Sequence, residues 1–142
     1  MVAQAAMALF AHLLGGTWSC TTLVPATGST PPHTDRSIAA FTQEPGGVVH
    51  DRITASDYAG DFYIGYDPRS ARYWLTGVDT LGTSISLVSQ DGLHYDGTAS
   101  MGGVVMKDSA TYTNVSANET HAREVFTRPG VQAIFETVCT RS

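Results

Sequence analysis

Residues 17–25 read TWSCTTLVP and residues 131–140 read VQAIFETVCT. They are the first and last extended segments of the chain, and each holds one of its two cysteines, Cys20 and Cys139. A closed antiparallel barrel makes its first and last strands neighbours, so a disulfide can join them. We therefore favour a barrel, in which this disulfide would contribute about 4–5 kcal/mol of stability. Two free buried thiols are the alternative interpretation.

The segments between the two cysteines are short and alternate with turn sequences. The Asp91-Gly92 pair is a strong hairpin signal, and Pro45-Gly46-Gly47 is typical of a tight turn. About ten short strands joined in this way indicate an antiparallel meander, and closure removes its unpaired edges. A two-sheet sandwich is less favoured, because only the loop over residues 26–34 is long enough for a crossover. The strands are expected over residues 17–25, 35–43, 48–57, 61–66, 72–78, 83–89, 93–99, 104–114, 120–127 and 131–140.

One helical signal precedes the first strand. Apolar side chains recur at helical spacing over residues 3–14, and Gly15-Gly16 ends the pattern. We expect this short N-terminal helix to cap one end of the barrel, with Trp18 packed beneath it. Alternation within strands places Trp18 on the same face as Cys20, and Phe135 on the same face as Cys139.

The composition limits the functional classes. At 142 residues the chain is expected to form a single domain, residues 1–142, with 42% apolar and 15% charged residues. The net charge is −5 and the basic residues are scattered, which argues against nucleic-acid binding. No apolar run is long enough to span a bilayer. A disulfide requires an oxidising compartment, and AQA at residues 3–5 resembles the remnant of an export signal, so we expect a periplasmic or secreted protein.

Several short motifs resemble a bacterial family of lipocalin-like domains with no assigned function. These motifs are GGTW at 15–18, GGVV at 46–49, GYDP at 65–68, YW at 73–74 and VD at 78–79. The resemblance extends loosely over residues 8–140 and implies a calycin-type barrel with an internal cavity. It implies no catalytic residues. The cysteine pair and the proline-containing loop depart from the family pattern and indicate an exported variant.

Two polar pairs and a set of aromatic residues are the candidate ligand contacts. His50 and Arg52 share a strand face and, if that face is the lumen, would anchor an acidic ligand group. His121 and Arg123 repeat the pattern on the penultimate strand. An outward, solvated position is the alternative for each pair, because arginine is mostly exposed. The candidate aromatic wall residues are Tyr63, Trp74, Tyr95 and Tyr112.

No motif indicates a metal or a cofactor. The chain lacks HExxH, GxSxG and a phosphate-binding loop, and Asp79 is expected to cap a turn rather than to catalyse. The sequence therefore predicts a monomer or homodimer that binds a small hydrophobic or aromatic molecule in its lumen. An enzyme on the same barrel is the main alternative, a cyclase, isomerase or lyase with a lumen His or Tyr as acid or base. A structural or protein-interaction module with a filled barrel is a third class.

Overall fold

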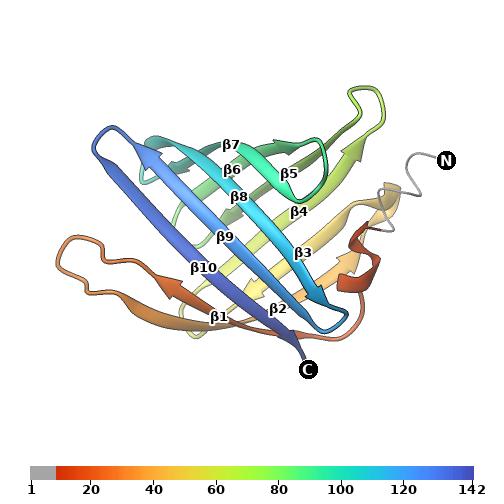
Figure 1. Cartoon of the computed structure of the whole chain (residues 1–142), viewed down its shortest axis with the longest axis horizontal. Coiled ribbons are helices and arrows are strands. Elements are labelled where there is room, and N and C mark those ends of the chain that lie inside the picture. Colours follow the sequence, from red (N-terminus) through yellow and green to blue (C-terminus); the bar gives the residue numbers. More distant parts are fainter. Residues whose placement is uncertain (1–8) are drawn as a thin grey trace.

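The computed structural model describes residues 9–142, which form a closed barrel of ten antiparallel strands (Figure 1). Consecutive strands pair around the barrel, and β1 pairs with β10. The predicted all-β up-and-down barrel is thus confirmed, with ten strands. They are β1 (Trp18–Val24), β2 (His33–Gln43), β3 (Val49–Thr54), β4 (Ala59–Asp67), β5 (Arg72–Asp79), β6 (Thr83–Ser89), β7 (His94–Met101), β8 (Val104–Ser116), β9 (Glu119–Arg128) and β10 (Val131–Arg141), with the 3-10 helices η1 (Ala11–Leu13) and η2 (Pro45–Gly47).

The strands form because apolar and polar residues alternate along them. In β6, Ile85, Leu87 and Ser89 are buried, whereas Ser86 and Val88 between them are exposed. A period of two places one set inside the barrel and the other on its outer surface. The same alternation, carried from strand to strand by the pairing register, defines the inward positions used below.

Aspartate side chains fix two of the hairpin turns. Asp91 accepts hydrogen bonds from the backbone N–H groups of Leu93 and His94, both at 2.8 Å. Asp79 accepts one from the N–H of Thr83 at 2.9 Å, which confirms its predicted role as a turn cap. These bonds replace the backbone pairing that a turn interrupts.

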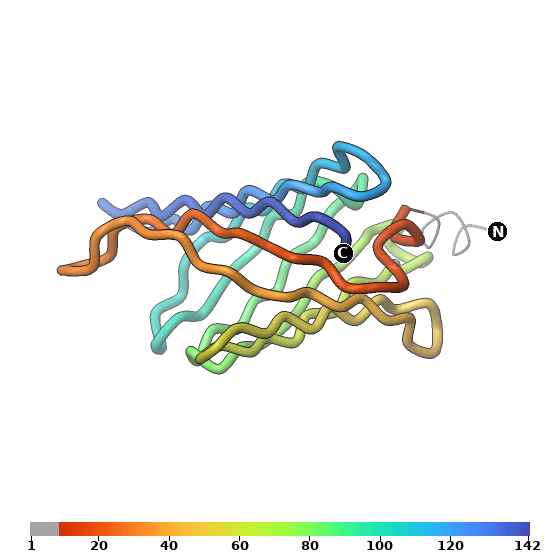
Figure 2. The backbone as a smooth tube through the Cα atoms, turned by 90° about the horizontal axis from the view of Figure 1, so that it is seen from below, coloured from red at the N-terminus to blue at the C-terminus, as the bar shows by residue number. Residues whose placement is uncertain are grey.

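The segment before β1 closes one end of the barrel, where η1 lies in Figure 2. Phe10 is buried against the edge of Tyr73, with ring centroids 5.8 Å apart, and the Trp18 indole donates to the Leu13 carbonyl at 3.1 Å. The expected cap over Trp18 is therefore confirmed. Its helix is shorter than expected within the described residues, and residues 3–8 of the predicted helix lie outside them. Among residues 9–142, no helix is long and apolar enough to cross a bilayer.

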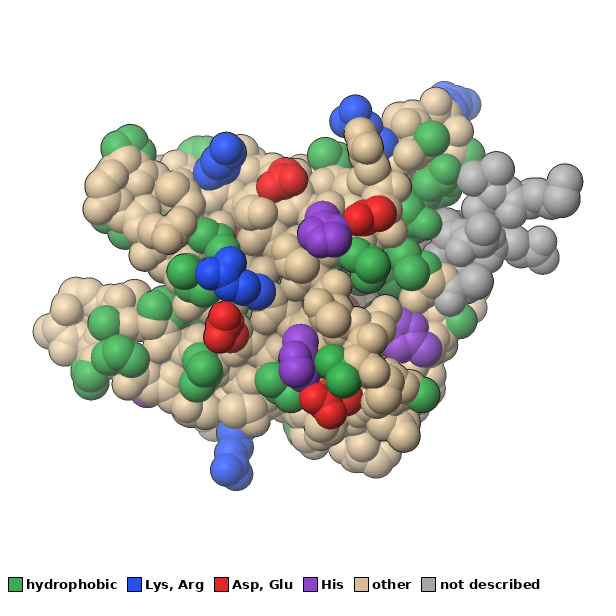
Figure 3. Space-filling model, viewed as in Figure 1, with side chains coloured by type: hydrophobic (Ala, Val, Ile, Leu, Met, Phe, Trp, Pro, Cys, Tyr) green, Lys and Arg blue, Asp and Glu red, His purple; other side chains and the backbone are tan. Residues whose placement is uncertain are grey.

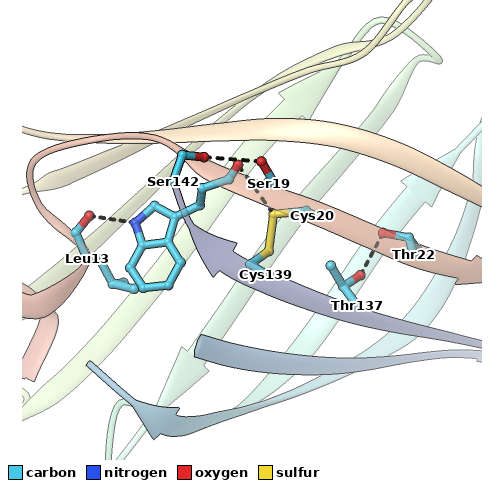
Figure 4. Close-up of a disulfide and its surroundings, with 8 residues drawn as sticks. Leu13, Ser19, Cys20, Thr22, Thr137, Cys139 and Ser142 are labelled. Carbon is cyan, nitrogen blue, oxygen red and sulfur yellow. Dashed lines mark hydrogen bonds between the residues drawn. A yellow bond between two sulfur atoms is a disulfide. The ribbon is translucent and has the colours of Figure 1, made fainter. Parts of the chain in front are cut away.

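The barrel closes at the β1–β10 pairing (Figure 4). Cys20 lies directly opposite Cys139 and forms a disulfide with it, with the two Cα atoms 4.1 Å apart. The hydroxyls of Thr22 and Thr137, one inward position further along, are 2.8 Å apart. The predicted disulfide is thus confirmed.

Candidate functional site

The inner wall is apolar near the capped end. A continuous cluster of buried side chains there and along the wall includes Phe10, Val49, Leu75, Leu87 and Tyr95. A second cluster, built on Trp18 and Cys20, packs beside the disulfide. This end of the barrel is therefore filled with protein side chains.

The inner wall is polar further along the barrel. Asp51 of β3, Asp108 and Tyr112 of β8 and Glu124 of β9 take inward positions, and we refer to these four residues as the acidic cluster. Register places Asp51 opposite Phe62, and puts Asp108 and Glu124 one inward step apart on the paired strands β8 and β9. The charges of Asp51, Asp108 and Glu124 all act on the Tyr112 hydroxyl. Residues of β3, β8 and β9 are therefore within electrostatic range of one another inside the barrel.

Three members of the acidic cluster are enclosed by protein and still keep accessible surface. Asp51, Tyr112 and Glu124 lie so deep that burial is the leading cause of their altered pKa values. Each is nevertheless only half-buried by accessible area, unlike Asp108, which is 0% exposed. Because these side chains take inward positions, their accessible surface lies on the inner face of the barrel wall.

Burial changes the proton affinity of the cluster. It raises the pKa of Asp51 to about 7 and that of Asp108 to about 6. It also raises the pKa of Glu124 well above its usual range, with the charge of Asp108 adding to the effect. Desolvation disfavours a carboxylate in a low-dielectric interior, so the cluster holds protons that exposed carboxyls would lose.

Several polar atoms of the inner wall have no hydrogen-bond partner among the described residues. They are both carboxyl oxygens of Asp108, one of Asp51, and the hydroxyl of Tyr95. An unpaired buried polar group costs about 1–3 kcal/mol, so such atoms commonly mark a functional site.

Of the predicted ligand contacts, the structure places Tyr95 and Tyr112 inside the barrel. They occupy inward positions on β7 and β8, and their rings meet edge to face with centroids 5.8 Å apart. These two of the four predicted wall residues therefore lie on the inner side of the sheet. Their contact with a ligand stays a prediction.

The expected lumen position of His50 and Arg52 is corrected, because β3 turns Val49 and Asp51 inward and these two side chains outward. On the outer surface His50 bonds to Asp61 at 2.8 Å, and Arg52 forms an ion pair with the same carboxylate. The hydrogen bond from His50 has the largest effect in lowering the pKa of Asp61, and the interaction with Arg52 adds to it.

The other three predicted contacts also lie outside. Tyr63 stacks on the His50 ring with centroids 4.6 Å apart. Trp74 covers Gly65, its partner on β4, and forms part of an outer-surface groove. His121 bonds to Glu119 at 2.6 Å, and its side chain is 44% exposed. The alternation pattern could not decide these positions, because aromatic and histidine residues are common on both faces of a sheet.

The sequence interpretation missed the three carboxyl residues of the acidic cluster. The missed signal was an acidic residue at an apolar inward position. Glu124 lies between Ala122 and Phe126 on one face, and Asp108 lies between Met106 and Ala110. Acidic residues are rarely fully buried, so an acid in an apolar register marks a functional candidate.

A separate groove lies on the outer surface beside the β1–β10 seam. The β1–β10 pairing ends at Leu23 and Glu136. Beyond this point the β1–β2 hairpin and the β9–β10 hairpin diverge and leave the notch seen in Figure 3. The groove has a volume of about 470 Å³ and is lined in part by Leu23, Ile134 and the Arg123–Glu136 ion pair. These residues point outward, so the groove is distinct from the acidic cluster.

The described residues contain no group of three or more His, Cys, Asp or Glu side chains arranged to hold a metal ion. No family model matches the chain, and no curated protein matches it. The similarity to lipocalin-like domains stays a prediction from the motifs. The acidic cluster on the inner wall is therefore the feature on which a function can be based.

Proposed function

We propose that this protein binds a small, partly apolar or aromatic molecule in the lumen of its barrel. The observation that carries the proposal is the accessible surface of Asp51, Tyr112 and Glu124 deep within the wall. Mostly apolar walls with a few placed polar groups are typical of small-molecule sites. Phe62 and Phe135, which are partly buried against the core, supply apolar wall beside these polar groups.

The proposal includes a compartment. The Cys20–Cys139 disulfide supports an oxidising environment outside the cytoplasm, periplasmic or extracellular, because cytosolic thiols are kept reduced. The barrel and the disulfide are compatible with the exported lipocalin-like protein that the sequence motifs indicate.

Lumen binding is tested with two variants, one that adds a side chain inside the lumen and one that adds the same side chain on the outer surface. Ala122→Phe adds an aromatic ring at an inward position, between Tyr112 and Thr137 in register. Thr113→Phe adds the same ring at an exposed outward position on β8. We expect the neutral probe N-phenyl-1-naphthylamine to fluoresce with the wild-type protein and the Thr113→Phe variant, and not with the Ala122→Phe variant.

Probe binding that survives Ala122→Phe in a protein of unchanged circular dichroism would place the probe outside the lumen and overturn the proposal. Native mass spectrometry of freshly purified protein gives an independent readout. We expect a retained small-molecule mass that the Ala122→Phe variant lacks.

A second candidate function is acid–base catalysis in the same lumen. Two observations favour it: the pKa of Asp51 is raised to about 7, and the Asp51 charge acts on the Tyr112 hydroxyl. A general acid or base works best when its pKa is close to the pH of the reaction. The predicted histidine base has no support, since His50 and His121 lie outside. Incubating the protein with the retained molecule and following its mass distinguishes the two: turnover that Asp51→Asn abolishes supports an enzyme.

A further inference from the structure

The ionisable groups of the inner wall share one charge sign. Between the two rims of the barrel, the inward positions of the described strands carry acids and tyrosines and no Lys, Arg or His. The groups are Asp51 on β3, Tyr66 on β4, Tyr73 and Asp79 on β5, Tyr95 on β7, Asp108 and Tyr112 on β8, and Glu124 on β9, with Tyr58 in the β3–β4 turn.

The basic side chains with inward register lie at the rims. Arg128 and His33 are exposed at the end away from η1. Arg141 is at the capped end, where its guanidinium donates to the carbonyl of Gly15 at 2.5 Å and stacks on Trp18. The protein therefore provides no cation to the acidic cluster.

Unpaired acceptors point to a hydrogen-bond donor from outside the protein. Asp108 is 0% exposed, and its carboxyl oxygens have no hydrogen-bond partner other than the neighbouring Glu124 carboxyl, while one oxygen of Asp51 has none. Tyr112 and Glu124 of the same cluster keep accessible surface. Buried charges in proteins are paired, so a positively charged donor would stabilise the ionised form of these carboxyls.

The aromatic residues around the cluster suit the same ligand. Tyr112 meets Tyr95 edge to face, and Phe135 meets Phe126 at a centroid distance of 5.6 Å. Phe135 is the register partner of Glu124 on β10. Ring faces attract cations and also pack against an apolar body.

We propose that the lumen selects a ligand carrying a protonated amine on an apolar or aromatic body, with Asp108, Glu124 and Asp51 as the counter-charges. This inference rests on the proposed lumen binding and names the ligand class. An anionic ligand is disfavoured, because it would meet the carboxyls with no compensating cation. A neutral ligand would leave the carboxylates unpaired.

Binding of an ammonium group should release protons. The cation stabilises the ionised carboxylates, so it lowers their pKa values toward normal. The protons of Asp51 and Asp108, whose pKa values are about 7 and about 6, then pass to the buffer. A neutral ligand of the same shape has no such effect.

The experiment compares three probes of similar size: phenethylamine, 2-phenylethanol and phenylacetate. Calorimetric titrations at pH 7.5 are expected to show phenethylamine binding about tenfold or more tightly than the alcohol, with phenylacetate the weakest. Repeating the titration at pH 6.5 in buffers of different ionisation enthalpy should show net proton release for the amine alone.

The variants test which residues carry the preference. Asp108→Asn with Glu124→Gln should bring the ratio of phenethylamine to 2-phenylethanol affinity from about tenfold to near one, and an unchanged circular dichroism spectrum reports that the barrel is intact. The single variant Glu124→Gln serves if the double variant does not fold. Asp96→Asn, at an exposed outward position on β7, is the matched control and should keep the preference.

Equal affinity for the amine and the alcohol would overturn the amine inference and leave lumen binding standing. A preference that persists when the cluster carboxyls are removed would also overturn it. Absence of binding for all three probes and for N-phenyl-1-naphthylamine would count against the proposed function itself.

Discussion

Cys20 and Cys139 occupy directly opposed positions in the β1–β10 pairing, the one pair of neighbouring strands in the barrel that no turn connects. Every other strand pair is held together by a short chain connection. The disulfide supplies the missing covalent link at this seam. It therefore acts on closure of the barrel as well as on the unfolded chain.

Replacing both cysteines by serine should lower the free energy of unfolding by about 4 kcal/mol, because the cross-link closes a loop with a sequence separation of 119 residues. Guanidinium denaturation of the oxidised protein and the variant measures this difference. Reductant should destabilise the wild-type protein by a similar amount and leave the double variant unaffected. Equal stability of variant and parent would show that the seam holds without its disulfide.

The barrel could be predicted from the sequence because its signals are local. Alternation with period two, the Asp91-Gly92 hairpin signal and the position of the two cysteines each act over a few residues. The ten strands and the Cys20–Cys139 bridge follow from them. The 3-10 geometry of Ala11–Leu13 does not follow from helical periodicity, and in this segment Leu13 packs on Trp18 and accepts its indole hydrogen bond.

The inner and outer faces of each strand could not be assigned with the same success. His50 and Asp51 are neighbours on one strand, and alternation requires only that they face opposite ways. The choice is made by register with Phe41 and Phe62, whose rings lie inside and hold Asp51 between them. This long-range constraint turns the polar pair of His50 and Arg52 outward. Strand register of this kind cannot be derived from the local pattern of a single sequence.

Arg141 fastens the cap to the end of the barrel. Its guanidinium donates to the carbonyls of His12, Leu14 and Gly15 and lies 4.6 Å from the Trp18 ring centre. Arg141→Ala should destabilise the protein by about 2 kcal/mol. It should also speed hydrogen exchange of the Trp18 indole N–H, which bonds to the cap at Leu13.

The control for Arg141 is the exposed Arg128 at the opposite rim. Arg128→Ala should change stability by less than about 0.5 kcal/mol and leave indole exchange unaltered. Indole exchange in the Arg141→Ala variant at the wild-type rate would mean that apolar contacts, such as those of Phe10 and Leu13, hold the cap without Arg141.

Gly97 on β7 lets strand β6 approach without a clash. A Cβ atom at this position would lie 2.1 Å from the Ser86 carbonyl oxygen and 2.9 Å from the Leu87 Cα, which are backbone atoms that cannot rotate away. Gly97→Ala should therefore cost about 3 kcal/mol of stability. Gly65→Ala is the matched comparison, since its Cβ would meet the movable Trp74 side chain, and we expect a smaller loss in thermal unfolding. Equal losses would contradict the backbone clash.

The pH dependence of stability tests the acidic cluster without any ligand. Burial raises the pKa of Asp51 from 3.8 to about 7, so between these values the folded state binds more protons than the unfolded state. Stability from this group is then full below about pH 4, falls as the pH rises to about 7, and stays constant above. The raised pKa of Asp51 corresponds to a loss of roughly 4 kcal/mol.

Asp51→Asn keeps the shape of the protonated carboxyl and removes the titration. The variant should gain stability relative to the wild-type protein as the pH rises from 4 to 8, by up to about 4 kcal/mol in urea denaturation. Asp96→Asn on the outer surface should track the wild-type protein over the same range, because its carboxyl is exposed. Carboxyls whose pKa values are lowered, such as Asp61, change stability with pH in the opposite direction. Their contribution is the same in variant and parent, so it cancels when the two free energies of unfolding are subtracted. A flat difference between Asp51→Asn and the parent would show that water or counter-ions reach Asp51 freely, and the cluster would then be an ordinary solvated surface.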